Sequence, residues 1–166
     1  MARRLAATFF ALLALALLAG LFFGVMRALP GADPQTILGG YSPAQVEDFF
    51  AGLTLEQRQI WRTGIIYLDF PFIFATGMAG YLTFSGAHGP LRLAGMVALG
   101  VFVFFDALED FQLLARLDPI LLAGWLPDPA ISQDAFWLGW VTTAKFVGLL
   151  AVVLLAVPAI WQKPRP

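Results

Sequence analysis

"GVFVFFDALEDFQLL", residues 100–114, is an apolar segment that carries three acidic residues, Asp106, Glu109 and Asp110. It belongs to a longer stretch, residues 93–114, that can cross the hydrocarbon core of a bilayer as a helix. On a helix the three acids share one face, because residues three and four apart are neighbours. An ionised side chain in the bilayer costs at least about 2.5–3.5 kcal/mol and usually faces a partner inside the protein. We therefore predict that this face points into a helical bundle.

The composition of the chain is that of an integral membrane protein. Of its 166 residues, 60% are hydrophobic and 13% are charged, and the mean hydropathy is +0.79, whereas soluble domains average about 45–50% and about 25%. Four apolar stretches are each long enough to cross a membrane; they lie at residues 5–26, 64–84, 93–114 and 136–160. We predict an all-α membrane protein, an up-down four-transmembrane-helix bundle that forms a single domain over residues 1–166.

The first apolar stretch also has features of a secretory signal peptide. Its apolar run is longer than the usual signal core, however, and no clear cleavage site of small residues follows it. We predict that residues 5–26 are an uncleaved transmembrane helix.

Several functional classes are excluded or disfavoured. The net charge of −1 and the absence of a Lys/Arg run exclude a nucleic-acid partner. The chain has no cysteine, which excludes disulfides, thiolate metal sites and cysteine nucleophiles. We find no catalytic triad, phosphate-binding loop or dinucleotide fingerprint, and no predicted span contains a histidine that would ligate a haem. We therefore predict no cofactor and no catalytic residue.

Basic residues are distributed unevenly between the two sides of such a bundle. The side with both chain ends and the loop at residues 85–92 carries five basic residues and no acid: Arg3, Arg4, Arg92, Lys163 and Arg165. The other side carries Arg27, Arg58, Arg62 and Arg116, diluted by Asp33, Glu47, Asp48, Glu56, Asp118, Asp128 and Asp134. Short cytoplasmic segments are enriched in Lys and Arg. We therefore predict a multi-pass protein with both termini in the cytoplasm.

The first outer loop, residues 42–62, has two helix-start signals. Ser42 is followed three residues later by Gln45, and Thr54 is followed at the same spacing by Gln57. Both are capping boxes, in which the two side chains bind the first backbone N–H groups of a helix. We predict two short helices here, the second running toward the second span, which act either as a lid that packs on the bundle or as a gate for a substrate.

Polar groups in three spans are predicted to meet at one depth. At about 1.5 Å per residue, Asp69, Glu109, Lys145 and Asp106 lie about 8–14 Å below the outer ends of their helices. The predicted cluster is Arg62, Asp69, Asp106, Glu109, Asp110, Thr142 and Lys145. We expect Lys145 to pair chiefly with Asp106, and the spacing of seven residues puts Arg62 and Asp69 on one side of their helix.

The cluster has a structural and a functional interpretation. A buried ion pair can simply fix how helices pack, and Glu109 and Asp110, nearer the outer end, would then be partly solvated. However, four acids around one internal lysine exceed what such a pair requires. Carboxylate oxygens suit Mg²⁺ or Ca²⁺, but Lys145 competes with a cation, so we predict no metal.

These motifs resemble those of a group of bacterial four-span membrane proteins of unassigned function. The pattern of that group is an acid shortly before a proline in span two, D-x-x-E-N in span three and T-x-x-K in span four. The matching residues are Asp69 with Pro71, Asp106 with Glu109, and Thr142 with Lys145, and the chain has Asp110 in place of the Asn. The resemblance covers residues 42–150 and implies a bacterial inner (cytoplasmic) membrane and a polar unit without a named reaction.

Three functional hypotheses are consistent with these features. The first is a non-enzymatic protein that binds a partner protein, as an accessory subunit, or an amphiphilic ligand through the cluster near the outer leaflet. The second is a lipid- or isoprenoid-modifying enzyme in which clustered carboxylates transfer protons. The third is a proton-coupled small carrier. Expected partners are the lipid bilayer, a membrane-protein complex or a second copy of the chain, and an amphiphile.

Overall fold

The computed structural model describes residues 1–29, 42–117 and 136–162. It is an all-α bundle, as predicted, and the described residues contain no strand. The elements in chain order are α1 (Ala2–Gly20), η1 (Leu21–Val25), η2 (Met26–Ala28), α2 (Pro43–Gly52), α3 (Leu55–Gly64), η4 (Ile65–Asp69), α4 (Phe70–Phe84), α5 (Pro90–Leu117) and α6 (Phe136–Trp161). Here η1 and η4 are single π-helical turns, and η2 is a 3-10 turn.

Four of the helical segments are long and apolar enough to cross a membrane, so the chain is a multi-pass membrane protein. They are Ala2–Ala28, Leu55–Phe84, Pro90–Leu117 and Trp140–Trp161. The second begins at Leu55 instead of residue 64, because α3 continues without a break through η4 into α4. The second of the two predicted short helices is therefore the outer end of a span.

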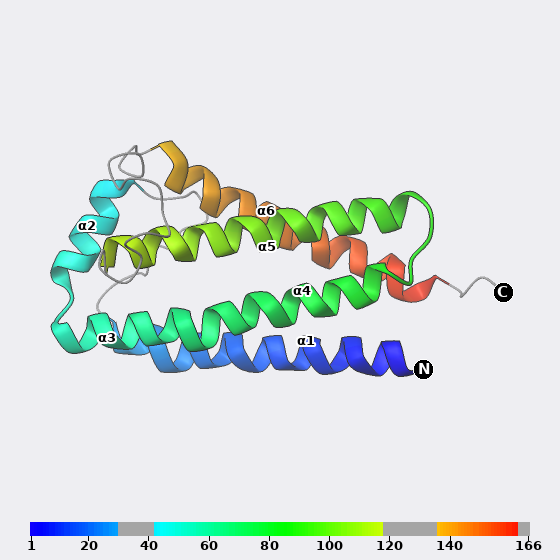
Figure 1. Ribbon diagram of the computed structural model, residues 1–166, viewed down its shortest axis with the longest axis horizontal. Coiled ribbons are helices and arrows are strands. Elements are labelled where there is room, and N and C mark those ends of the chain that lie inside the picture. The colour runs from blue at the N-terminus through cyan, green and yellow to red at the C-terminus, as the bar shows by residue number, and fades with distance from the viewer. Residues whose placement is uncertain (30–41, 118–135, 163–166) are drawn as a thin grey trace.

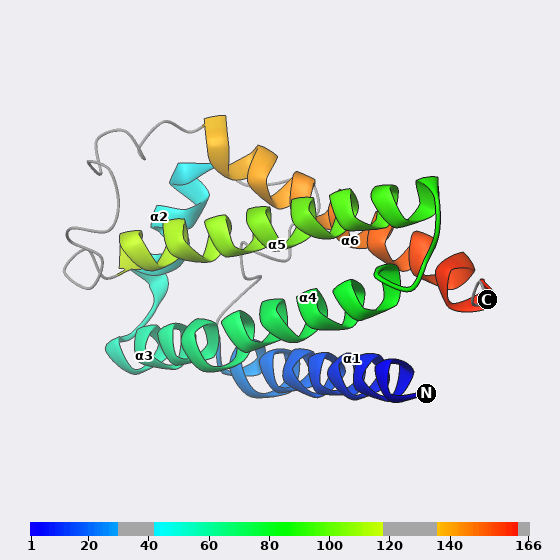
Figure 2. The same cartoon turned by 45° about the vertical axis from the view of Figure 1, so that its right-hand side comes forward.

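The four long helices form two pairs, which Figures 1 and 2 show from two directions. α1 packs against α4, α5 packs against α6, and contacts between α4 and α5 join the pairs. Successive spans run in opposite directions, and both chain ends lie at one end of the bundle together with the loop between α4 and α5. Of the charges used to predict orientation, Asp33, Asp118, Asp128, Asp134, Lys163 and Arg165 lie outside the described residues.

Both predicted capping boxes are confirmed. Ser42 Oγ accepts from the Gln45 backbone N–H at 3.3 Å, and Gln45 Oε1 accepts from the Ser42 N–H at 2.7 Å. Thr54 and Gln57 form the same pair of bonds at 3.2 and 3.0 Å. These bonds satisfy N–H groups that a helix start leaves without a partner, so local sequence alone fixes where α2 and α3 begin.

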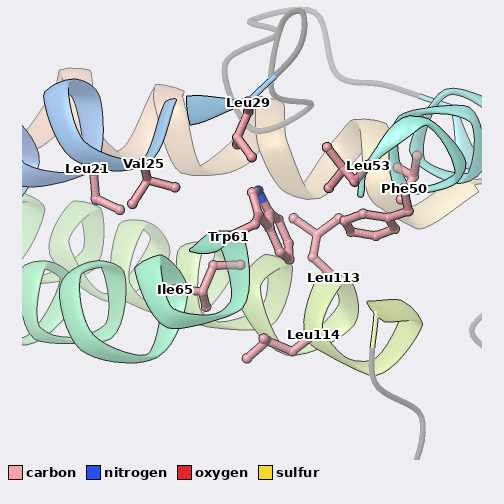
Figure 3. Close-up of a cluster of buried hydrophobic side chains, with 10 residues drawn as sticks. Leu21, Val25, Leu29, Phe50, Leu53, Trp61, Ile65, Leu113 and Leu114 are labelled. Atoms are coloured by element: carbon pink, nitrogen blue, oxygen red, sulfur yellow. The ribbon is translucent and has the colours of Figure 1, made fainter. Parts of the chain in front are cut away.

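The outer helices close one end of the bundle over an apolar core (Figure 3). The core comprises Leu21, Val25, Leu29, Val46, Phe50, Leu53, Trp61, Ile65, Leu113 and Leu114. The Phe50 and Trp61 rings meet edge to face with centroids 5.0 Å apart, a favourable aromatic geometry. Arg58 Nη2 also donates to the Phe50 carbonyl at 2.7 Å. Of the two interpretations of this segment, the geometry is that of a packed lid.

Candidate functional site

The acidic face of α5 points into the bundle, as predicted. Asp106 is 2% exposed, and Glu109 and Asp110 are 0% exposed, whereas Phe104 on the opposite face is 61% exposed. The expectation that Glu109 and Asp110 are partly solvated is therefore wrong. The reason is that α5 continues beyond the predicted end of the span, to Leu117, and the core under the lid covers the turn above Asp110.

Lys145 of α6 binds two of these carboxylates rather than chiefly one. Its Nζ lies 3.0 Å from Asp106 Oδ1 and also contacts Glu109 Oε2. The Thr142 hydroxyl, one turn earlier on α6, donates to the other Glu109 oxygen, Oε1. Lys145 and Thr142 are themselves buried. Glu109 is thus fixed by two groups from α6, and α5 and α6 are joined by charge-assisted hydrogen bonds.

Gly148 allows these contacts, and its role was not predicted from the sequence. A Cβ at this position would lie 2.8 Å from the backbone nitrogen and 3.0 Å from the Cα of Phe102. The α6 backbone therefore approaches the α5 backbone closely, one turn from Lys145, as small residues permit between membrane helices. The glycine in "KFVGLL" was visible in the sequence, but its spacing alone does not show which helix it would meet.

Asp69 enters the cluster from a π-helical turn. Pro71 has no backbone N–H to donate to the preceding turn, and the helix widens to the π turn Ile65–Asp69 directly before it. Asp69 is buried, and its carboxyl group lies near that of Asp110. The wider turn changes the helical register after Arg62, so the seven-residue spacing of Arg62 and Asp69 does not by itself fix the side of the helix that each residue faces.

A cavity of about 430 Å³ lies beside the cluster. Its polar lining consists of Asp69, Asp106 and Lys145. Its apolar lining comes from both halves of the bundle and consists of Leu18, Leu21, Phe22, Met26, Phe72, Phe102, Phe146 and Leu149. Glu109, Asp110 and Thr142 are buried and do not line the cavity. Arg62 is half-buried in the last turn of α3 and does not line it either. The cluster is therefore accessible from the cavity through three side chains.

The chemistry of the cluster is acidic. It brings together four carboxyl groups and one ammonium group, so acceptor oxygens outnumber the cationic donors. In the described part of the chain, no three Asp, Glu or His side chains are placed to hold a metal ion. The arrangement can accept hydrogen bonds from a ligand in the cavity, or exchange a proton with it.

Comparisons with known proteins found no match for this chain among protein-family models, curated proteins or solved structures. The resemblance to bacterial four-span proteins stays a prediction from the motifs at Asp69, Asp106 and Lys145.

Proposed function

We propose that this protein binds an amphiphilic ligand inside the membrane, without chemistry of its own. One observation carries the proposal: a cavity of about 430 Å³ has aromatic and aliphatic walls and three ionisable side chains on its surface, Asp69, Asp106 and Lys145. Ligand sites typically measure about 300–1,000 Å³ and combine apolar walls with a few placed polar groups. The apolar part of the ligand would lie against the walls and its polar group against the cluster.

The charges favour a cationic or hydrogen-bond-donating polar group. Lys145 is already engaged by Asp106 and Glu109, so it does not offer an unneutralised positive charge to the cavity. Asp69 lines the same cavity and adds acceptor oxygens. An anionic head group would meet an excess of buried acid, which is unfavourable in a medium of low dielectric constant. A long-chain amine or alcohol fits this site better than a fatty acid.

The fold also offers a route from the bilayer. The cavity is lined by Leu18 and Phe22 on one side and by Phe146 and Leu149 of α6 on the other. α1 packs mainly on α4, and α6 packs mainly on α5 (Figure 2). Because its lining includes residues of both pairs, the cavity lies between them. At the outer end the lid packs on the bundle. We infer that a ligand enters sideways, between α1 and α6.

Binding is tested with two neighbouring leucines. Leu149 lines the cavity, whereas Leu150 is 60% exposed on the outer surface of α6. Leu149→Trp should fill the cavity and abolish thermal stabilisation by dodecylamine, and Leu150→Trp, the matched control, should preserve it. Dodecanoate, of equal chain length, should stabilise neither variant nor the unmodified protein.

Three results would contradict the proposal. The first is thermal stabilisation by dodecanoate equal to that by dodecylamine. The second is an equal response of the two tryptophan variants to dodecylamine. The third is detection by native mass spectrometry of a stoichiometric protein subunit and no small molecule. The last result would favour the accessory-subunit hypothesis. The test therefore separates a ligand from a protein partner.

A second candidate function is a lipid- or isoprenoid-modifying activity. The observation in its favour is that Asp106 and Lys145 are in contact and both line the cavity, which is the geometry that proton transfer to a bound ligand requires. The test is to incubate the protein in nanodiscs with an isoprenoid lipid and to compare the products with those of Asp106→Asn. Unchanged lipid in both samples would reject this activity.

We further propose that the protein resides in a bacterial inner membrane with both termini in the cytoplasm. The support is that Arg3 and Arg4 lie in the first turn of α1 and Arg92 in the first turn of α5. Both helices begin at the end of the bundle that carries both termini (Figure 1). Because the chain has no cysteine, single-cysteine variants can be labelled cleanly from the periplasm. A cysteine at position 47 should react and one at position 88 should not; the reverse pattern would invert the orientation.

A further inference from the structure

We propose that a second cavity, at the end of the bundle that carries both termini, binds the phosphate group of an anionic phospholipid. The cavity measures about 250 Å³ and lies between α1, α4 and α6, far along the bundle from the lid. Arg3 and Arg4 supply its charge, and Thr8 and Gln162 add polar groups. This site shares no lining residue with the cavity at Lys145, so the inference does not depend on the proposed ligand there.

The charge of this cavity is one-sided. Among the described residues, its lining contains two arginines and no acid. Both arginines are exposed, and two positive charges beside one small cavity attract an anion. Arginine is also the side chain best suited to phosphate, because its planar group offers paired N–H donors that match phosphate oxygens.

Gly86 lies against the side chain of one of the two arginines, Arg3. A Cβ at position 86 would overlap the guanidinium group of Arg3, so a side chain at this position would force the end of Arg3 to move away from the loop after α4. The side chain of Gln162 is fixed as well, because its Oε1 accepts the His88 backbone N–H at 2.8 Å. This bond directs the carbonyl side of the amide to the loop and leaves the NH₂ group to donate elsewhere.

The remaining lining favours a lipid over a free phosphate ion. Four small side chains, Ala7, Ala11, Ala79 and Ala159, continue the cavity from the arginines along the apolar part of the spans. Free phosphate would occupy only the basic part. A phospholipid would place its phosphate at the arginines and its glycerol and upper acyl chain against the alanines. The arginines also stand at the start of an apolar span, where lipid head groups are found.

The test is a lipid titration of the full chain in a neutral detergent, followed by native mass spectrometry. The probes are dioleoyl phosphatidylglycerol, dioleoyl phosphatidylcholine and inorganic phosphate. We expect one tightly retained phosphatidylglycerol. Each arginine near an anionic lipid contributes about fivefold in affinity, so Arg3→Gln with Arg4→Gln should weaken binding by about 25-fold.

Two further variants separate a built site from general surface attraction. Gly86→Ala keeps every charge but displaces the flexible end of Arg3, so it should weaken phosphatidylglycerol binding by about fivefold, as loss of one arginine would. Arg92 is exposed at the same end of the bundle, as Arg3 and Arg4 are, but it does not line the cavity. Arg92→Gln should therefore change affinity by less than about twofold.

Three outcomes would overturn the inference. They are equal retention of phosphatidylcholine, equal weakening by Arg92→Gln and by the Arg3/Arg4 pair, and inorganic phosphate that displaces the lipid at similar concentration. The first would show that lipid retention does not depend on head-group charge, and the second that it depends on surface charge in general. The third would show that the cavity binds a free anion. Circular dichroism of each variant confirms that the helices are intact.

Discussion

Removing the Lys145 ammonium should destabilise the fold more than removing any single carboxylate that it contacts. Lys145→Met leaves Asp106 and Glu109, both almost fully buried, without the cation that lies between them. Breaking a buried ion pair in this way costs about 3–5 kcal/mol of unfolding free energy. Asp106→Asn should cost less, about 1.5–3 kcal/mol, because Lys145 keeps its contact with Glu109.

The structure also predicts how these losses combine. When Lys145→Met, Asp106→Asn and Glu109→Gln are introduced together, no charge in the triad remains unpaired, so most of the stability should return. Replacing a buried ion network with neutral groups is often close to neutral in energy. The coupling between Lys145→Met and Asp106→Asn should therefore be large, about 2 kcal/mol, within the range for groups in direct contact.

Unfolding by SDS in mixed micelles measures these differences. Trp61 is 1% exposed in the core under the lid and provides a fluorescence signal. Strictly additive losses would refute the predicted coupling, since groups that bind one another cannot act independently. It would also be refuted if Lys145→Met were as stable as the unmodified protein. In that case the triad would be dispensable for folding.

Gly148→Ala should destabilise the protein by about 1–3 kcal/mol, because the new methyl group meets the Phe102 backbone. Gly100→Ala is the control: no atom lies within 4 Å of its added Cβ, so it should be neutral or stabilising by up to about 1 kcal/mol. Equal effects of the two substitutions in SDS unfolding would contradict the close approach of α5 and α6. Ser42→Ala removes one bond of the first capping box, which should cost about 1 kcal/mol and accelerate amide exchange in Pro43–Gly52 but not in the segment begun by Thr54.

Local patterns allowed much of the fold to be predicted. The four spans follow from composition and length, which need no knowledge of neighbours. The acid face of α5 was assigned correctly because a charge in lipid must turn inward wherever its helix lies. The capping boxes at Ser42 and Thr54 were predicted residue by residue, since their bonds close within four residues. The start of the second span was missed, because its outer end is polar enough to read as a separate helix.

The sequence by itself determined which helices form, which face of α5 is polar and which end of the bundle is basic, because each depends on periodicity and composition along one segment. Only the tertiary structure decided that Lys145 binds Glu109 as well as Asp106 and that two cavities open between the helix pairs. These depend on how far apart the helices stand and how each is rotated. Gly148 sets the approach of α6 to α5, and the π turn before Pro71 sets the direction of Asp69. The first contact joins residues 46 positions apart in the chain, and the second is a departure from the regular helical period that the residue spacing does not show.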